Sequence, residues 1–149
     1  MIASVQPFHA IDDGRWAVRR IGQQRLAGTY AFRSLIDSGA TVTFGSDWPV
    51  GPLDAMEGIY AAVTRETIDG RNPNGWLPDE KTTVTQALQA YTTANAFAGF
   101  QEKTLGRIAP GYIADLTVLD GNVLTSEPDK LRQIQVLQTI VDGRSRFIA

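Results

Sequence analysis

The strand–helix–strand pattern in the first 46 residues limits this sequence more than any other feature. Ile2–Val5 and Thr41–Phe44 are short apolar or β-branched runs, the second of which ends at Gly45. Residues 29–38 between them carry apolar side chains at helical spacing and are followed by a glycine. Two strands joined through a helix by short connections favour a βαβ unit with a parallel sheet. The predicted fold class is therefore α/β.

Two longer helices are expected after this unit. Asp54 followed by Glu57 forms a D-x-x-E capping box, and Thr83 followed by Gln86 forms a second box ahead of an apolar pattern with steps of three and four. Capping residues satisfy backbone N–H groups that have no partner within the first helical turn. These boxes predict helices that begin near residues 55 and 84.

The pattern changes at about residue 104. Residues 105–119 suggest two strands around the turn Pro110-Gly111, and Asp142-Gly143 separates two further strand-like runs. Asp-Gly between two such runs is a strong hairpin signal because both residues tolerate positive φ. We expect an α/β region at residues 1–103 and antiparallel strands at residues 104–149.

The composition excludes several classes of protein. The chain has 149 residues, no Cys, one His and a net charge of −2. Disulfides, zinc ribbons, iron–sulfur clusters and thiol nucleophiles are therefore excluded, as is a metal site that needs two imidazoles from this chain. The charge gives no reason to expect nucleic acid or an anionic membrane as partner. The sequence shows no signal peptide or transmembrane run, so a cytoplasmic location is expected.

Polar side chains follow both predicted strands where the chain leaves the sheet. His9 comes shortly after Ile2–Val5, and Asp47 follows Thr41–Phe44. Ligands of parallel sheets and barrels gather at the C-terminal ends of strands, where an imidazole binds a metal and a carboxylate accepts a proton from water. Gly45 would leave space beneath the Asp47 carboxylate.

Structural roles also explain these residues. His9 alone is compatible with a surface or hydrogen-bonded histidine, and Asp47 ahead of Pro49 is compatible with a turn. Asp115 lies within an apolar run, where a structural hydrogen bond is the favoured explanation. Trp48 is either loop packing or the wall of a pocket.

The sequence nevertheless resembles the metal-dependent amidohydrolase superfamily, in the branch that includes N-substituted formamide deformylase. The resemblance rests on segments that follow one another in the family's order: Ser4-Val5-Gln6-Pro7-Phe8-His9, Gly45-Ser46-Asp47-Trp48-Pro49-Val50, residues 58–65 (GIYAAVTR), the helix around residues 87–94, and residues 106–120 (GRIAPGYIADLTVLD). It extends over nearly the whole chain, and the combination is specific.

The resemblance implies a partial (β/α)8 (TIM-type) barrel that contributes strands six to eight, followed by C-terminal strands of a small β-sandwich. It places Ile2–Gln6 as strand six, with His9 as a metal ligand, and residues 41–46 as strand eight. Asp47 would then be both a metal ligand and the catalytic proton acceptor. The implied cofactor is a divalent metal, with zinc expected, and the implied reaction is hydrolysis of a carbon–nitrogen bond in a small amide or formamide.

The family's earlier metal ligands have no counterpart in this sequence. A (β/α)8 barrel needs about 250 residues, so the chain is expected to be the C-terminal portion of a larger enzyme and to be inactive alone. Unpaired barrel edges would favour self-association. The alternative is a non-catalytic remnant or interaction module.

Overall fold

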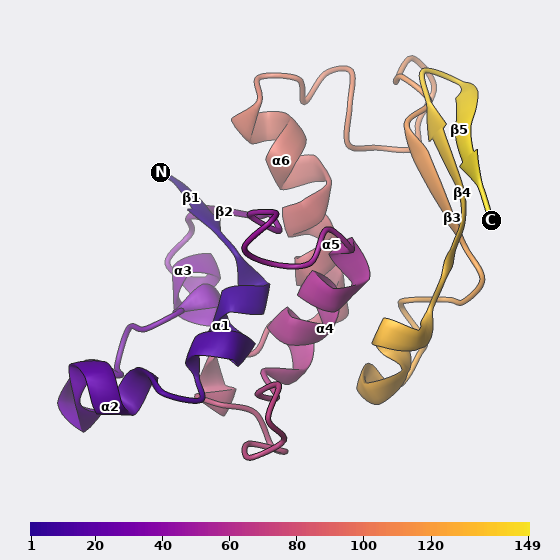
Figure 1. Cartoon of the computed structure of the whole chain (residues 1–149). Helices are drawn as coiled ribbons and strands as arrows, with labels where there is room; N and C mark the ends of the chain where they lie inside the picture. Colours follow the sequence, from indigo (N-terminus) through magenta and orange to yellow (C-terminus); the bar gives the residue numbers. More distant parts are fainter.

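Two short parallel strands form the centre of the first region. β1 (Ile2–Val5) pairs with β2 (Thr41–Phe44), with Ile2 opposite Thr41 and Val5 opposite Phe44. The computed structural model describes residues 1–149, and Figure 1 shows this pair at one side of the molecule. Val42, Thr43 and Phe44 are all buried, as expected for a strand covered on both faces in an α/β protein.

Helices precede and follow β2 and pack against it, whereas alternate residues of β1 are exposed. Three α-helices and a 3₁₀ turn connect the strands: α1 (Pro7–Asp13), α2 (Ala17–Ile21), η1 (Gln23–Arg25) and α3 (Phe32–Asp37). The helices after β2 are α4 (Ala55–Thr64), η2 (Pro78–Glu80), α5 (Val84–Tyr91) and α6 (Thr93–Ala98). None of these helices is long and apolar enough to span a bilayer.

Both predicted helix starts are confirmed. Asp54 is the N-cap of α4 and accepts a hydrogen bond from the Met56 amide at 2.9 Å, while Thr83 and Gln86 form a reciprocal capping box on α5. Glu57 does not complete the box with Asp54, because its carboxylate binds Arg132, 2.6 Å from Nη2. The expected single helix after Thr83 is interrupted after Tyr91, and α6 continues from Thr93.

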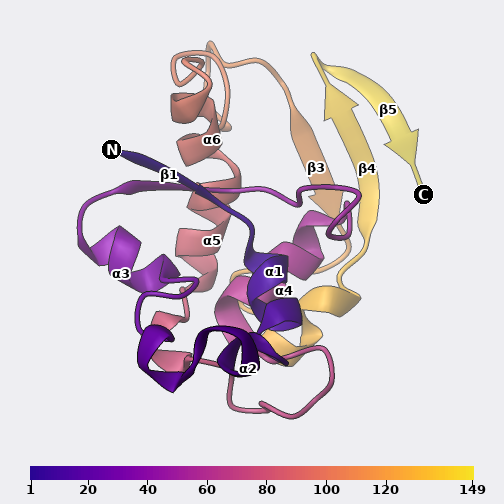
Figure 2. The same cartoon turned by 60° about the vertical axis from the view of Figure 1, so that its left-hand side comes forward.

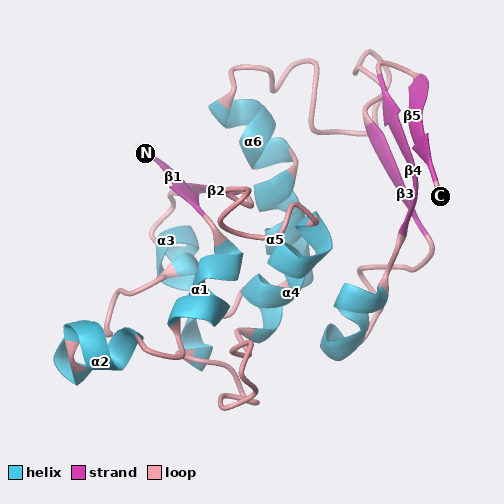
Figure 3. Ribbon diagram, in the orientation of Figure 1, coloured by secondary structure: helices cyan, strands magenta, loops and turns pink.

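The second sheet contains three antiparallel strands in the order β3–β4–β5. They are β3 (Leu116–Leu119), β4 (Val136–Val141) and β5 (Arg144–Ile148), and a 3₁₀ helix, η3 (Pro128–Gln133), lies between β3 and β4. Figure 3 shows these strands as a group separate from β1 and β2. The predicted hairpin is confirmed: Asp142 and Gly143 have φ values of 51° and 70°, as a type I′ turn requires.

One predicted strand is not formed. Residues 105–115 make turns and bends, so the expectation of two strands around Pro110-Gly111 is wrong for the first of them. Gly106 has φ +83° and packs closely against Ala96 and the Thr92 carbonyl at the end of the helices. A positive φ and this close approach to the helices do not fit an extended strand at this position. Ile108 remains 90% exposed.

The strand pairing also changes the barrel assignment. The resemblance led us to expect strands six to eight, but this region has two strands, and they pair directly with each other. Consecutive strands are neighbours in a (β/α)8 barrel, each followed by its helix. If β2 is strand eight, β1 takes the place of strand seven. The placement of Ile2–Gln6 as strand six therefore does not agree with the pairing.

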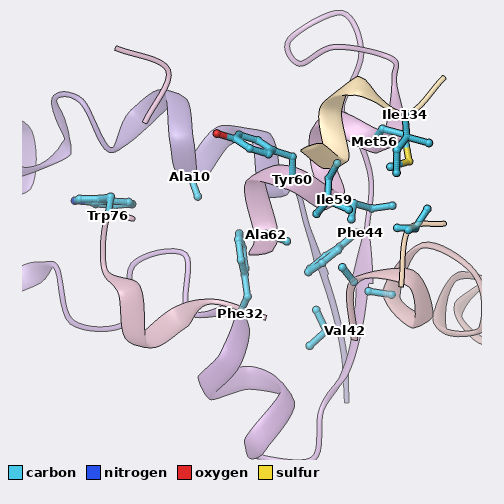
Figure 4. Packing of buried hydrophobic residues seen from close by; sticks show 14 of the residues in the cluster. Ala10, Phe32, Val42, Phe44, Met56, Ile59, Tyr60, Ala62, Trp76 and Ile134 are labelled. Carbon is cyan, nitrogen blue, oxygen red and sulfur yellow. The ribbon is translucent and has the colours of Figure 1, made fainter. Parts of the chain in front are cut away.

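The hydrophobic core is centred on α4. Met56, Ile59 and Ala62 from this helix are buried in a cluster with Phe32 and Phe44 (Figure 4). The second region joins the same cluster through residues in and around η3, namely Val123, Leu131 and Ile134. Figure 2 shows η3 beneath α4, with the sheet standing beside the helices.

Arg132 of η3 makes the polar contacts between η3 and α4. Its guanidinium lies 4.4 Å from the Tyr60 ring centroid and binds the Glu57 carboxylate through two nitrogens. Such a two-nitrogen contact fixes geometry better than a single ion pair. The contact fixes the position of η3 on α4.

Arg65 is the most unusual residue of the core. It is completely buried at the C-terminal end of α4, with φ 54°, and no carboxylate binds its guanidinium. Nε donates to the Trp76 carbonyl at 2.7 Å and Nη1 to the Tyr30 carbonyl at 3.0 Å. The guanidinium also lies 5.1 Å from the Phe32 ring centroid. Burial lowers the pKa of Arg65 to about 10, although Glu80 acts in the opposite direction, so the side chain remains charged at neutral pH.

Gly58 allows the close packing of α4 on α5. A Cβ atom at this position would lie 1.8 Å from the Tyr91 hydroxyl oxygen. Gly58→Ala gains about 1 kcal/mol of helix propensity but forces the phenol to move, at a cost of about 1–3 kcal/mol. We expect a net loss of free energy of unfolding in urea titrations. Tyr91→Phe in the same chain should recover part of this loss, because it removes the hydroxyl oxygen that the new Cβ would meet. If the effects of the two substitutions on the free energy of unfolding were strictly additive, the two residues would not be in contact as described.

Candidate metal and catalytic site

His9 lies in the first turn of α1, immediately after β1. Pro7 occupies the first helical position, where its missing N–H has no cost, and the His9 amide bonds the Gln6 carbonyl at 3.2 Å. The imidazole is largely buried, with 20% of its side chain exposed. Its Nε2 atom is completely buried and has no hydrogen-bond partner. An unpartnered buried nitrogen is costly unless a ligand or water satisfies it.

Asp47 lies three residues beyond the end of β2. Its backbone is in the left-handed region, with φ 54°, and its carbonyl accepts the Val50 amide at 2.8 Å. Asp is one of the few residues that tolerate this conformation, and such conformations are concentrated at functional sites. The Asp47 side chain is 56% exposed, so its carboxylate is open to solvent on one side.

The two predicted site residues come together in the structure. His9 Nε2 lies 3.8 Å from Asp47 Oδ2, which is too far for a direct hydrogen bond. Two ligands of one zinc ion, each about 2.0–2.2 Å from it, stand about 3.4 Å apart at the tetrahedral angle. The pair therefore fits two positions of a metal coordination shell, and the unpartnered His9 Nε2 supplies a free donor atom.

The chain does not contain a complete metal site. No group of three or more His, Asp or Glu side chains is arranged to hold a metal ion. A catalytic zinc site uses three protein ligands and one open position. His9 and Asp47 can therefore supply only part of such a site.

Asn95 makes a contact beside the site that the sequence did not predict. From α6, its amide nitrogen donates to the Phe44 carbonyl at 3.1 Å, at the end of β2, and to the Tyr91 carbonyl at 3.2 Å. The side chain thus binds an edge carbonyl of β2 where the chain turns toward Asp47. The one feature of the sequence that could have indicated this contact is that Asn95 is a polar residue within an apolar helical pattern.

Three other residues that the sequence singled out lie outside the pair His9 and Asp47. The Asp115 carboxylate accepts the Asp142 amide at 2.8 Å, which confirms the structural role expected for it, although the residue is exposed. Trp48 is 65% exposed beside Asp47. A Cβ atom at Gly45 would meet nothing within 4 Å, so the space around this position is open.

Comparison with known proteins assigns the family. The sequence pattern of the amidohydrolase family matches residues 1–147. The chain belongs to the amidohydrolase family. It is 33% identical over 140 residues to YtcJ of Bacillus subtilis and 37% identical over 118 residues to N-substituted formamide deformylase of Arthrobacter pascens. These matches cover 94% and 79% of the chain.

Solved structures agree with this membership of the amidohydrolase family. An uncharacterized metal-dependent hydrolase from Pyrococcus horikoshii superposes with a TM-score of 0.71 at 29% identity, over 85% of this chain. The chain spans only 25% of that hydrolase, and 26% and 21% of the YtcJ and deformylase sequences. It thus corresponds to about a quarter of a typical relative.

Gly51 fixes the loop that carries Asp47. A Cβ atom at Gly51 would lie 2.5 Å from the Ser46 carbonyl oxygen, whereas one at Gly45 meets no atom. Gly51→Ala should therefore lower the free energy of unfolding by about 1–3 kcal/mol and shift the His9 ring resonances in NMR spectra. Gly45→Ala is the matched control and should change stability by less than about 0.5 kcal/mol. Equal effects of the two substitutions would show that the loop is not held as described.

Proposed function

We propose that the chain is the C-terminal part of a metal-dependent amidohydrolase that hydrolyses a non-peptide carbon–nitrogen bond in a small amide or formamide. The observation that carries the proposal is the approach of His9 Nε2 to Asp47 Oδ2 at the ends of two neighbouring parallel strands. Similarity to a formamide deformylase and to a metal-dependent hydrolase supports both the reaction and the metal.

Each residue has a separate role in the proposed reaction. His9 would hold a divalent metal through Nε2, and Asp47 would hold it through Oδ2. A divalent metal, zinc in our proposal, supplies Lewis acidity that polarises a carbonyl group and acidifies water. Asp47 accepts a proton as water attacks the amide carbon and returns it to the leaving nitrogen. The partial exposure of the Asp47 carboxylate leaves room for water and substrate beside it.

The proposal also includes the organisation of the complete enzyme. Residues 1–103 would belong to a (β/α)8 barrel and residues 104–149 to a β-sandwich beside it. The remaining metal ligands would come from barrel strands that precede β1 in the relatives. The isolated chain would be inactive, because it holds two of the required ligands. The free edge of β1 would favour self-association, since its outer backbone groups have no strand partner.

A non-catalytic role is the second candidate. The observation that favours it is the lack of a three-ligand cluster. Under this alternative, the unpartnered His9 Nε2 would bind only water. The two candidates differ in what happens when the other barrel strands are supplied.

The role of Asp47 can be tested in a chain that carries the complete barrel, built by joining residues 1–149 to the preceding region of a relative. Asp47→Asn should lower kcat by at least about 100-fold while leaving the circular dichroism spectrum unchanged, because the amide cannot accept a proton. Asp115→Asn is the matched control and should retain kcat. Full turnover by Asp47→Asn would rule out the assigned role.

Metal content distinguishes the two candidate functions. The isolated chain should retain far less than one zinc per molecule after gel filtration, whereas the completed barrel should retain stoichiometric metal. His9→Ala in the completed barrel should lower metal affinity by about 10-fold or more. Stoichiometric metal and amide hydrolysis by residues 1–149 alone would contradict the proposal, and a completed barrel without metal would favour the non-catalytic role.

A further inference from the structure

A cavity of about 690 Å³ lies between α4 and α5 on one side and β3 and β4 on the other. This volume is within the range of small-molecule sites, about 300–1,000 Å³. Neither His9 nor Asp47 lines it, so the cavity is distinct from the candidate metal site. Its walls are mainly apolar, and the large apolar residues are Leu53, Met56, Ile59, Leu88, Leu119 and Val136.

The sheet presents one face to this cavity. Thr117 lies opposite Thr139, and Leu119 lies opposite Val136, in the register of β3 and β4. All four residues line the cavity. Val118 does not, because successive side chains of a strand point to opposite faces. The cavity therefore has one wall of defined sheet side chains and one wall of helix side chains.

Tyr91 provides a polar group in the helical wall. Its ring packs edge-on against Phe44, with ring centroids 5.6 Å apart, and its hydroxyl lies over Gly58. These two contacts hold the phenol in one orientation. Burial, with a smaller contribution from the charge of Asp54, raises the pKa of Tyr91 to about 12, so the hydroxyl is neutral at physiological pH.

Asp54 is the only charged residue that lines the cavity. Its Oδ1 atom accepts the Met56 amide at 2.9 Å as the cap of α4, and no hydrogen bond within the protein involves Oδ2. The lining contains no Lys, Arg or His that would attract an anion. Charge complementarity therefore favours a cationic group over a carboxylate or phosphate.

We propose that this cavity binds a small apolar primary amine. The ammonium group would donate to the Asp54 carboxylate and the Tyr91 hydroxyl oxygen, and the hydrocarbon part would lie between the helical residues Met56 and Ile59 and the sheet. This site does not depend on the proposed hydrolase activity, because none of its groups belongs to the pair His9 and Asp47.

The first test compares three ligands of the same shape on the purified 149-residue chain. 4-Phenylbutylamine, 4-phenylbutanol and 4-phenylbutanoate are titrated against ¹⁵N-labelled protein up to about 10 mM. We expect the amine to bind about five- to tenfold more tightly than the alcohol and the carboxylate to bind most weakly. Amide shifts should be concentrated at Met56, Tyr91, Thr117 and Thr139.

Two pairs of variants locate the site. Asp54→Asn keeps an effective helix cap but should reduce amine affinity to that of the alcohol, whereas Asp79→Asn, on the exposed turn η2, should have no effect. Thr117→Trp should fill the cavity and abolish binding of both the amine and the alcohol. Val118→Trp, on the opposite face of β3, should bind normally.

Several results would overturn the proposal. These are no binding of the amine at any concentration tested, a carboxylate that binds as tightly as the amine, an unchanged amine affinity in Asp54→Asn, or equal losses in Thr117→Trp and Val118→Trp. A concentration-dependent dimer that Thr117→Trp dissociates would identify a second copy of the chain as the occupant instead.

Discussion

The direct parallel pairing of β1 with β2 determines where the polar side chains of the first region lie. Because the strands run in the same direction, both leave the sheet at one end, and the next few residues of each carry His9 and Asp47. An antiparallel pair would have placed these residues at opposite ends of the strands. Because β1 and β2 are also adjacent in the sheet, the residues that follow them can contribute to one site.

The helix α4 connects this site to the rest of the molecule. It follows the Asp47 loop, packs against α1 and α5 in the common core, and binds η3 through Glu57 and Arg132. The sheet β3–β4–β5 therefore has a fixed place beside the helices, and the cavity between them results from this arrangement. The apolar residues in and around η3, not those of the sheet, supply most of the contact with the core.

Local chemistry explains what the sequence could predict. Asp54, Thr83 and Asp142-Gly143 act on their own neighbouring backbone, so their caps and turn were recognisable without a fold. The position of a strand in the barrel depends on its pairing with distant segments, which the sequence does not show. The assignment of Ile2–Gln6 as strand six did not agree with the direct pairing of β1 and β2. A strand was expected before Pro110-Gly111, but Gly106, with φ +83° and close to Ala96 and Thr92, does not fit an extended strand there. His9 and Asp47 were brought together as expected, while their chemical roles stay predictions.

Arg65 has a consequence for how the molecule opens. Its guanidinium ties the end of α4 to the carbonyl groups of Trp76 and Tyr30, which lie outside the helices and strands. If any one of these segments separates, the buried guanidinium loses a hydrogen-bond acceptor, which is costly. The three segments should therefore exchange their amide protons together, as one cooperative unit, even though they are far apart along the chain.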